Sequence, residues 1–211
     1  KEVAELYYDF QKAYDNVNHA FLEKLLKEYG FPSGVQMLII EMMARWKIRL
    51  SYGAKKEVGE VRLENGIIQG DAFSPLLFVL MIDPLIKIIK TRLGDRVEVL
   101  YYMVDLKAST GNVETARTIH SIVKEYAASV GMVINKKCAI QLNVKTPLPE
   151  SLQEIPRLDG TTYKYLCFEM MRGEVAMKEM MVKLEEWIKE KLEEPTSRGD
   201  VFKAKNLINF I

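Results

Sequence analysis

A short apolar strand that runs into a single carboxylate constrains this chain more than any other stretch. Residues Val97–Tyr102 are rich in β-branched and aromatic side chains and lead to Asp105. A second run, Val3–Tyr8, leads in the same way to Asp9. Two strands that each end on an aspartate can place both carboxylates at one edge of a sheet, where a divalent cation binds carboxylate oxygens. We therefore expect the two strand ends to be adjacent, although a lone Asp after a strand is also an ordinary turn residue.

Composition limits the kind of protein. The chain has 211 residues, of which 48% are hydrophobic, enough for one large domain or one domain with an appendage. Its formal net charge is +1, so any nucleic-acid-binding surface must be local. Cys138 and Cys167 lie far apart without a CxxC pattern, which argues against a structural zinc site or a disulfide scaffold.

The sequence contains no pattern typical of a membrane span or a signal peptide. The longest apolar run, Leu76–Ile89, is interrupted by Asp83, Pro84 and Lys87. We expect an intracellular protein without a membrane partner, in a compartment that the sequence leaves open. The chain opens on a strand and stops inside a helical pattern at Ile211, so we expect it to be part of a larger protein.

Helix signals alternate with strand signals along the chain. Asn18 and Gly30 frame one helix, Ser33 caps a second that runs to about Trp46, and Asn112 and Gly131 frame another. Ser74 is the expected N-cap of a further helix, and Pro75 would be its first helical residue, N1. The apolar helix that they open is expected at 76–82, and a charged helix is expected at 174–192. A hairpin is expected from strands at 47–52 and 57–63, with Gly53 in the turn. Further strands are expected at 132–134 and 139–142, and a strand or hairpin at 163–170. This mixture predicts an α+β fold.

Five motifs in a fixed order resemble those of the reverse transcriptases of non-LTR retroelements and group II introns. They are Asp9–Asp15, Gln69–Phe78, Tyr102–Asp105, Gly131–Cys138 and Tyr165–Cys167, which are similar to the family's DFxKAFD, QGDxLSPLLF, YxDD, Asn/Asp-x-Lys-Cys and YLG motifs. A single short motif is a weak signal, but five in order are specific.

The resemblance implies a polymerase palm, an antiparallel sheet backed by helices, with part of the fingers and the start of a helical thumb. The palm would span residues 1–170 with a fingers insertion at about 18–66, and the thumb would begin in 171–211. The implied activity is template-directed nucleotidyl transfer, RNA-directed DNA synthesis by two-metal chemistry. Its partners would be an RNA template and primer, a dNTP, and the remaining fingers and thumb of the same protein.

The resemblance also implies roles for individual residues. Asp9 and Asp105 would bind Mg²⁺ or Mn²⁺, and Lys137 would protonate or neutralise the leaving pyrophosphate. Phe10, Tyr14, Gln69 and Gly70 would form the nucleotide site, and Tyr165 and Leu166 would support the primer end. Each role has a plain alternative: Tyr14 as a core residue, Gln69 bonded within its own loop, and Lys137 as a solvated lysine.

Two positions depart from the family pattern. Val104 replaces the first aspartate of the YxDD box, so a principal metal ligand is lost and Asp105 remains alone. Because neighbouring strand residues point to opposite faces, Asp105 cannot adopt the geometry of residue 104 without a register slip. Cys167 replaces the glycine of the primer-grip turn, where a positive φ would strain a cysteine. These departures predict impaired catalysis. One alternative is that the protein with Val104 binds no metal ion.

Three hypotheses therefore stand. The chain is a reverse-transcriptase palm, active or impaired; or a degenerate, non-catalytic domain that binds RNA or protein in a ribonucleoprotein; or a structural α+β module in which the motifs are residual. For RNA binding we nominate basic residues around the expected hairpin, which equally fit an ordinary solvated surface. They are Arg45, Lys47, Arg49, Lys55 and Lys56, with Lys136 and Lys137.

Overall fold

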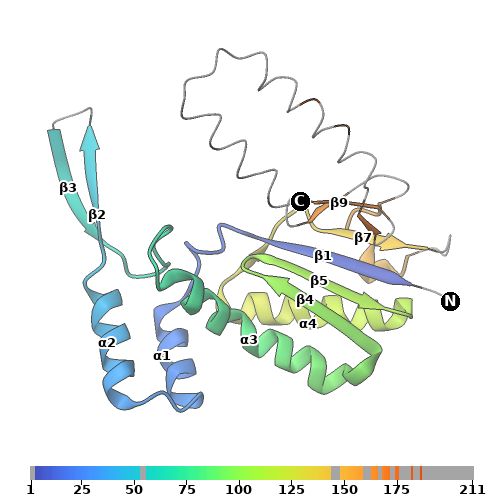
Figure 1. Ribbon diagram of the computed structural model, residues 1–211, viewed down its shortest axis with the longest axis horizontal. Coiled ribbons are helices and arrows are strands. Elements are labelled where there is room, and N and C mark those ends of the chain that lie inside the picture. The colour runs from blue at the N-terminus through green and yellow to red at the C-terminus, as the bar shows by residue number, and fades with distance from the viewer. Residues whose placement is uncertain are drawn as a thin grey trace. The chain divides into compact units, whose positions relative to one another are not determined.

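The computed structural model describes residues 3–52, 56–143, 148–158, 163–165, 168–171, 174–175, 182 and 186. It divides the chain into two compact units, Lys1–Asp159 and Gly160–Ile211. The first unit combines antiparallel sheets with packed helices, which confirms the predicted α+β class (Figure 1). The finer division into polymerase subdomains remains a prediction.

A five-stranded antiparallel sheet organises the first unit, with β1 (Ala4–Gln11) at its centre. The hairpin β4 (Val97–Tyr102) and β5 (Asp105–Thr110) lies on one side of β1. On its other side β1 pairs with both β6 (Val133–Ile134) and β7 (Ala139–Leu142). Because β1 has partners on both sides, its backbone is held rigidly, and it carries Asp9.

The two faces of β1 have different surroundings. Leu6, Tyr8 and Phe10 belong to the main apolar core. That core is shared with α3 (Ser74–Leu93) and α4 (Val113–Val130), which back the sheet (Figure 1). By the two-residue strand period, the alternate residues of β1, Asp9 among them, face the other side of the sheet.

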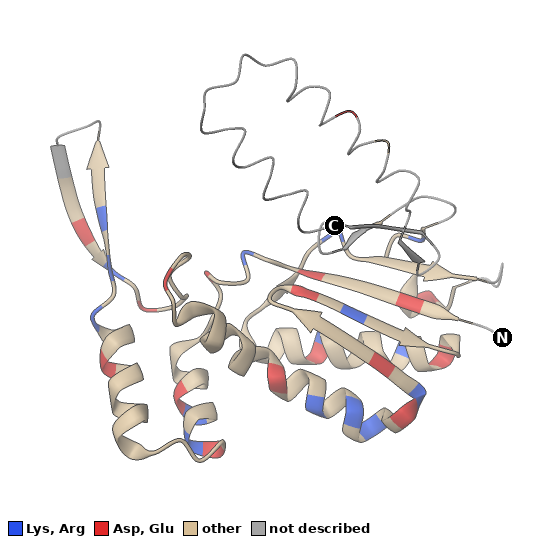
Figure 2. Cartoon of the chain, viewed as in Figure 1, with Lys and Arg blue, Asp and Glu red and all other residues tan. Residues whose placement is uncertain are grey.

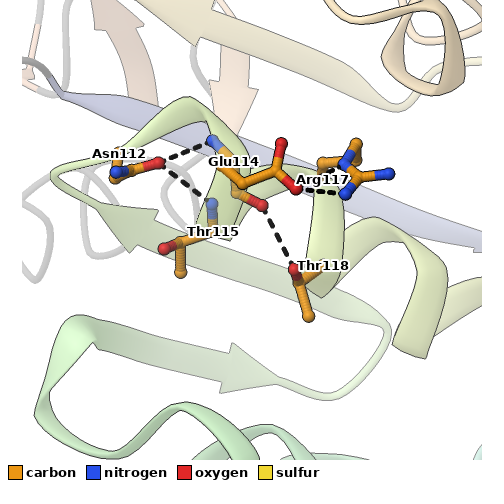
Figure 3. A network of polar contacts seen from close by, with 5 residues as sticks. All are labelled: Asn112, Glu114, Thr115, Arg117 and Thr118. Carbon is orange, nitrogen blue, oxygen red and sulfur yellow. Dashed lines mark hydrogen bonds and ion pairs between the residues drawn. The ribbon is translucent and has the colours of Figure 1, made fainter.

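Helix α4 begins and ends at the residues predicted for it. The Oδ1 atom of Asn112 accepts hydrogen bonds from the backbone N–H groups of Glu114 (2.7 Å) and Thr115 (3.2 Å), as Figure 3 shows. In the same turn Glu114 also pairs with the Arg117 side chain. The helix ends at Gly131, whose φ of 76° is the left-handed conformation that favours glycine. Both capping predictions are confirmed.

The first two helices confirm one cap and correct another. α1 (His19–Glu28) is capped by Asn18, whose Oδ1 accepts from the Phe21 N–H at 2.9 Å. α2 spans Ser33–Ala44, and its N-cap position is Pro32. The prediction that Ser33 caps this helix was therefore wrong, because Pro32 has the extended backbone of the cap and Ser33 is already helical.

Helix α3 differs from its prediction at both ends. Phe73 occupies the N-cap position, and the Ser74 hydroxyl instead donates to the backbone carbonyl of Ile68 at 2.5 Å. The helix continues through Pro84 to Leu93, well beyond the predicted end near residue 82. A proline inside a helix costs about 3 kcal/mol. The cost is offset because α3 buries a row of side chains along its length: Leu77, Met81, Leu85 and Ile89.

A two-stranded ribbon follows α2. β2 (Lys47–Tyr52) and β3 (Lys56–Arg62) form an antiparallel pair with an irregularity between Leu50 and Ser51, which confirms the predicted hairpin to within one residue. The predicted turn residue, Gly53, lies outside the described residues. In Figure 1 the ribbon extends beyond the end of α2.

The second unit contains a small antiparallel sheet with the order β10-β9-β8. β8 (Tyr163–Tyr165) and β9 (Phe168–Met171) form the predicted hairpin. The helix expected from Glu174 does not begin there, because β10 (Glu174–Val175) pairs with β9. The rest of that segment is described only at Val182 and Glu186, which are both helical.

Two short 3-10 turns, at Gly94–Arg96 and Glu150–Leu152, complete the described elements. Within the described part of the chain, no helix combines the length and apolar character that crossing a membrane requires.

Candidate active site

Asp9 and Asp105 lie directly opposite each other on paired strands. The β1–β5 register pairs these two residues, so their predicted adjacency is confirmed. Neither, however, closes a strand. β1 continues past Asp9 to Gln11, and Asp105 is the first residue of β5, where it also pairs with Tyr102 of β4. The carboxylates therefore project from a paired, rigid part of the sheet.

A two-residue turn, Met103 and Val104, connects β4 to β5. Met103 has a φ of 52°, a left-handed backbone conformation that is uncommon for a residue with a side chain. Val104 is half-buried and packs against the apolar core. The position next to Asp105 thus contributes hydrocarbon, and no oxygen, to this corner of the sheet.

The two carboxylates affect each other electrostatically. Partial burial raises the pKa of Asp105, and the negative charge of Asp9 raises it further. Two facing carboxylates with this repulsion fit one divalent cation, which would supply the missing positive charge. Among the described residues, no group of three or more His, Cys, Asp and Glu side chains is arranged to hold a metal ion. Within that part of the chain, Asp9 and Asp105 are therefore a pair of candidate carboxylate ligands.

The raised pKa of Asp105 has a consequence for stability. A carboxyl whose pKa is higher in the folded than in the unfolded state destabilises the fold above that folded pKa, and the penalty disappears below the unfolded value. We expect Asp105→Asn to raise Tm at pH 7 in metal-free buffer and to have progressively less effect as the pH falls toward 4. Thermal denaturation across this range measures it. A Tm unchanged or lowered at pH 7 contradicts the prediction.

Asp9 is enclosed by the turn that follows β6. The Asn135 Nδ2 atom donates to Asp9 Oδ2 at 2.8 Å, and the Asn135 backbone N–H donates to the Asp9 carbonyl at 2.8 Å. The Asp9 N–H donates to Cys138 Sγ at 3.3 Å. Burial raises the pKa of the Cys138 thiol to about 11, so it is a neutral hydrogen-bonding group at pH 7.

Tyr14 lies beside the β4–β5 turn. Its ring packs against Phe78 of α3 with a centroid distance of 5.2 Å, and its hydroxyl lies 3.7 Å from Met103 Sδ. The Ile67 N–H donates to the Tyr14 carbonyl at 2.9 Å, which ties this residue to the segment that carries Gln69. A β-carbon on Gly66 would lie 2.9 Å from the Asp15 carbonyl oxygen, so the close approach requires glycine.

The remaining nucleotide-site candidates differ in exposure. Phe10 is buried in the core beside Asp9. Gln69 and Gly70 form an exposed turn, and Gly70 has a φ of 88°. Lys137 is exposed in the turn after β6, where its backbone N–H donates to Asn135 Oδ1 at 3.2 Å. Tyr14 therefore lies at the β4–β5 turn before Asp105, and the turn that carries Lys137 contacts Asp9.

The nominated basic residues near the ribbon are exposed but paired with acids. Lys47 Nζ and Arg49 Nε contact the Glu60 carboxylate at 3.1 and 3.2 Å, and Arg45 contacts Glu41. Mainly through Lys47, this lowers the pKa of Glu60. With other residues they line a groove of about 880 Å³: Glu41, Ala44, Arg45, Trp46, Lys47, Arg49, Glu60, Arg62 and Ile68. Figure 2 shows basic and acidic residues interspersed in this region.

Some candidates lie outside the described residues. These are Lys55, Leu166 and Cys167, together with the side chains of Lys56 and Tyr165. Their predicted roles remain predictions.

Sequence reasoning missed a buried charged pair near the site. Lys107 Nζ lies 2.9 Å from Glu5 Oε1, and each side chain is only 10% exposed. The Tyr7 hydroxyl donates to Glu5 Oε2 at 3.1 Å. In the β1–β5 register, Tyr7 is opposite Lys107 and Asp9 is opposite Asp105. Because side chains two residues apart on a strand lie on the same face, the Lys107–Glu5 ion pair is on the face of the sheet that carries the two aspartates. The sequence signal was a charged residue at position 5 beside the apolar and aromatic residues of β1, with an opposite charge at position 107.

Comparison with known proteins places this arrangement in a family. Residues 5–170 match the family model described as reverse transcriptase (RNA-dependent DNA polymerase). Two matches to type-1 retrotransposable element R2 polyproteins of Popillia japonica are 30% identical over 87 residues and 24% identical over 143 residues. They cover 41% and 64% of this chain, but only 14% and 20% of the relatives' length.

Solved structures show the same fold at low sequence identity. The telomerase of Candida tropicalis in complex with a fragment of telomeric RNA matches 80% of this chain with a TM-score of 0.63 and 10% identity, over 28% of its own length. The apo form matches 80% with a TM-score of 0.61 and 9% identity, over 31% of its length. The polymerase palm and fingers fold expected from the motifs is therefore present. Because the family model covers most of the sequence, the chain belongs to the reverse transcriptase (RNA-dependent DNA polymerase) family.

Proposed function

We propose that this chain is the palm and part of the fingers of a template-directed nucleotidyltransferase whose chemistry is impaired by Val104. The observation that carries the proposal is the facing pair Asp9 and Asp105 beside a valine that offers no oxygen. A two-carboxylate site can hold one divalent ion, whereas two-metal phosphoryl transfer also needs an anchor for a second. RNA-directed DNA synthesis on an RNA template and primer is the activity proposed, with a dNTP as substrate.

The chain's own residues supply positioning and charge. Asp9 and Asp105 would hold Mg²⁺ or Mn²⁺, which when bound stabilises the attacking and leaving oxygens of phosphoryl transfer. Tyr14, fixed against Phe78, presents a flat side chain next to the turn at Met103, suited to packing against the sugar of a nucleotide. Exposed Gln69 offers both a donor and an acceptor to that nucleotide. Exposed Lys137 offers a proton or a positive charge to the leaving pyrophosphate.

Primer extension on an RNA template with the full-length protein tests the proposal. We expect slow, metal-dependent extension that is lost in Asp9→Ala, because removing one of two carboxylates leaves no chelate. Extension that is robust in the unchanged protein and insensitive to Asp9→Ala would refute both the assignment of the site and its impairment.

The groove beside the ribbon is the proposed contact for the RNA backbone. Glu60 neutralises Lys47 and Arg49 there, so phosphate must compete with a carboxylate already in place. We expect Glu60→Gln to raise affinity for single-stranded RNA on the order of threefold at low salt and to steepen its salt dependence. Fluorescence anisotropy over a range of salt concentrations measures both.

Glu98→Gln is the matched control, because it removes one exposed acid from β4 without releasing a basic residue of the groove. If both variants raise affinity equally, only net charge matters and the groove has no special role. A domain that binds RNA but extends no primer with either metal would be the degenerate, non-catalytic component of a ribonucleoprotein.

A further inference from the structure

The partner strand of β1 is interrupted opposite Asp9. β7 pairs Ala139 with Tyr7, and β6 pairs Ile134 with Phe10. Between these two pairs β1 contains two residues, Tyr8 and Asp9. The segment opposite, between β6 and β7, contains four residues, Asn135–Cys138. An extra-residue interruption of this kind re-aims side chains and is common beside active sites. Here the interruption coincides with a candidate metal ligand.

The Asn135–Cys138 turn satisfies the groups of Asp9 that regular pairing would have satisfied. Asn135 donates its backbone N–H to the Asp9 carbonyl, and Cys138 Sγ accepts the Asp9 N–H. In addition, the Asn135 side chain donates a hydrogen bond from Nδ2 to the Asp9 carboxylate at 2.8 Å, a contact that backbone pairing between strands does not provide. That bond fixes the orientation of the Asp9 carboxylate while Oδ1 of Asp9 remains available to an ion.

The same asparagine also shapes the turn that carries Lys137. Its Oδ1 accepts the Lys137 N–H at 3.2 Å, and its carbonyl accepts the Cys138 N–H at 3.1 Å. One side chain therefore bonds both the carboxylate of Asp9 and the backbone of Lys137. Asn135 is thus the single residue that links the two groups.

We propose that Asn135 is a positioning residue that orients the Asp9 carboxylate for metal binding and sets the Lys137 backbone relative to it. The inference rests on the proposed function, since it assigns a role to the same metal site. Groups that hydrogen-bond a metal ligand typically contribute 10- to 100-fold to metal affinity. The contribution here is made through Asp9, and Asn135 needs no contact with substrate.

Direct Mn²⁺ binding to the full chain, followed by the EPR signal of free Mn²⁺, tests this in a Val104→Asp background. We expect Asn135→Ala to weaken binding at least about tenfold. Asn135→Asp keeps the acceptor for the Lys137 N–H and adds a fourth carboxylate to the three of this background, so it is expected to bind Mn²⁺ more tightly than the parent. Asn16→Ala is the matched control, because it removes an asparagine hydrogen bond to the Gln11 carbonyl (2.9 Å) and none to Asp9, and it is expected to bind Mn²⁺ as the parent does.

The outcomes separate the two proposals. If Val104→Asp itself fails to bind Mn²⁺, the metal site of the proposed function is wrong, and the role of Asn135 is wrong with it. If Val104→Asp binds Mn²⁺, and both Asn135 variants in that background bind it with the same affinity as Val104→Asp alone, the metal site stands. The positioning role of Asn135 is then overturned. A fall in Tm of Asn135→Ala with unchanged Mn²⁺ affinity also overturns it, because a purely structural turn would behave in that way.

Discussion

Val104→Asp is expected to raise the rate of primer extension by on the order of 10³-fold. The residue lies in the two-residue turn beside Asp105, at the position where the resemblance places the first aspartate of the box. A carboxylate there would complete a set of three with Asp9 and Asp105 and allow the second metal ion to be held. Single-turnover extension of a primer on an RNA template, with Mg²⁺ and then with Mn²⁺, measures the rate.

Two control variants isolate the carboxylate. Val104→Asn has nearly the same shape as the aspartate without its charge, and we expect it to recover little of the rate. Asp9→Ala in the Val104→Asp background is expected to abolish the gain. If Val104→Asn extends primers as fast as Val104→Asp, the valine limits the reaction by its shape and not by the loss of a metal ligand.

Lys107→Ala is expected to lower the free energy of unfolding by about 3–5 kcal/mol, the usual cost of removing one partner of a buried ion pair. The Glu5 carboxylate would stay buried in the sheet without its cation. The hydrogen bond from the Tyr7 hydroxyl compensates only part of that charge. Urea denaturation followed by circular dichroism measures the change.

The double variant Glu5→Leu with Lys107→Met is the matched control. Replacing a buried pair by apolar residues of similar volume is often neutral or stabilising, so we expect it to recover most of the loss. Lys27→Ala, which removes the partner of Glu23 from an exposed pair on α1, should cost less than about 1 kcal/mol. A cost for Lys107→Ala no larger than that of Lys27→Ala would contradict the buried-pair argument.

The parts of the fold predicted correctly from the sequence are those set by local chemistry. Asn18 and Asn112 cap their helices because an Asn side chain reaches N–H groups two or three residues ahead, whatever surrounds it. Gly131 ends α4 because only glycine enters the left-handed region without strain. The β-branched and aromatic residues of Val97–Tyr102 likewise predicted β4, the strand before Asp105.

The parts predicted wrongly depend on contacts between distant residues. Pro84 is a local signal to end a helix, and it is overridden because Leu85 and Ile89 beyond it are buried against the rest of the core. β10 was predicted as helix, and its pairing with β9 decides otherwise. The strand β1 extends past Asp9 because Ile134 and Val133 of β6 pair with Phe10 and Gln11.

The candidate site was predicted only in part for the same reason. The spacing of strands and carboxylates predicted that Asp9 and Asp105 would be neighbours. The enclosure of Asp9 by Asn135 and Cys138 joins residues 126 and 129 positions apart, and no local pattern encodes that contact. The Asn-x-Lys-Cys pattern at Asn135–Cys138 marked both residues in the sequence, but it did not indicate that they contact Asp9.

The affinity of the unchanged full-length protein for Mn²⁺, compared with that of Val104→Asp, tests most directly the claim that a lost carboxylate limits this site. EPR titration of free Mn²⁺, with primer and RNA template bound, gives both values. We expect at least about tenfold weaker binding by the unchanged protein, because it lacks one charged ligand. Equal affinities in the two proteins would contradict it.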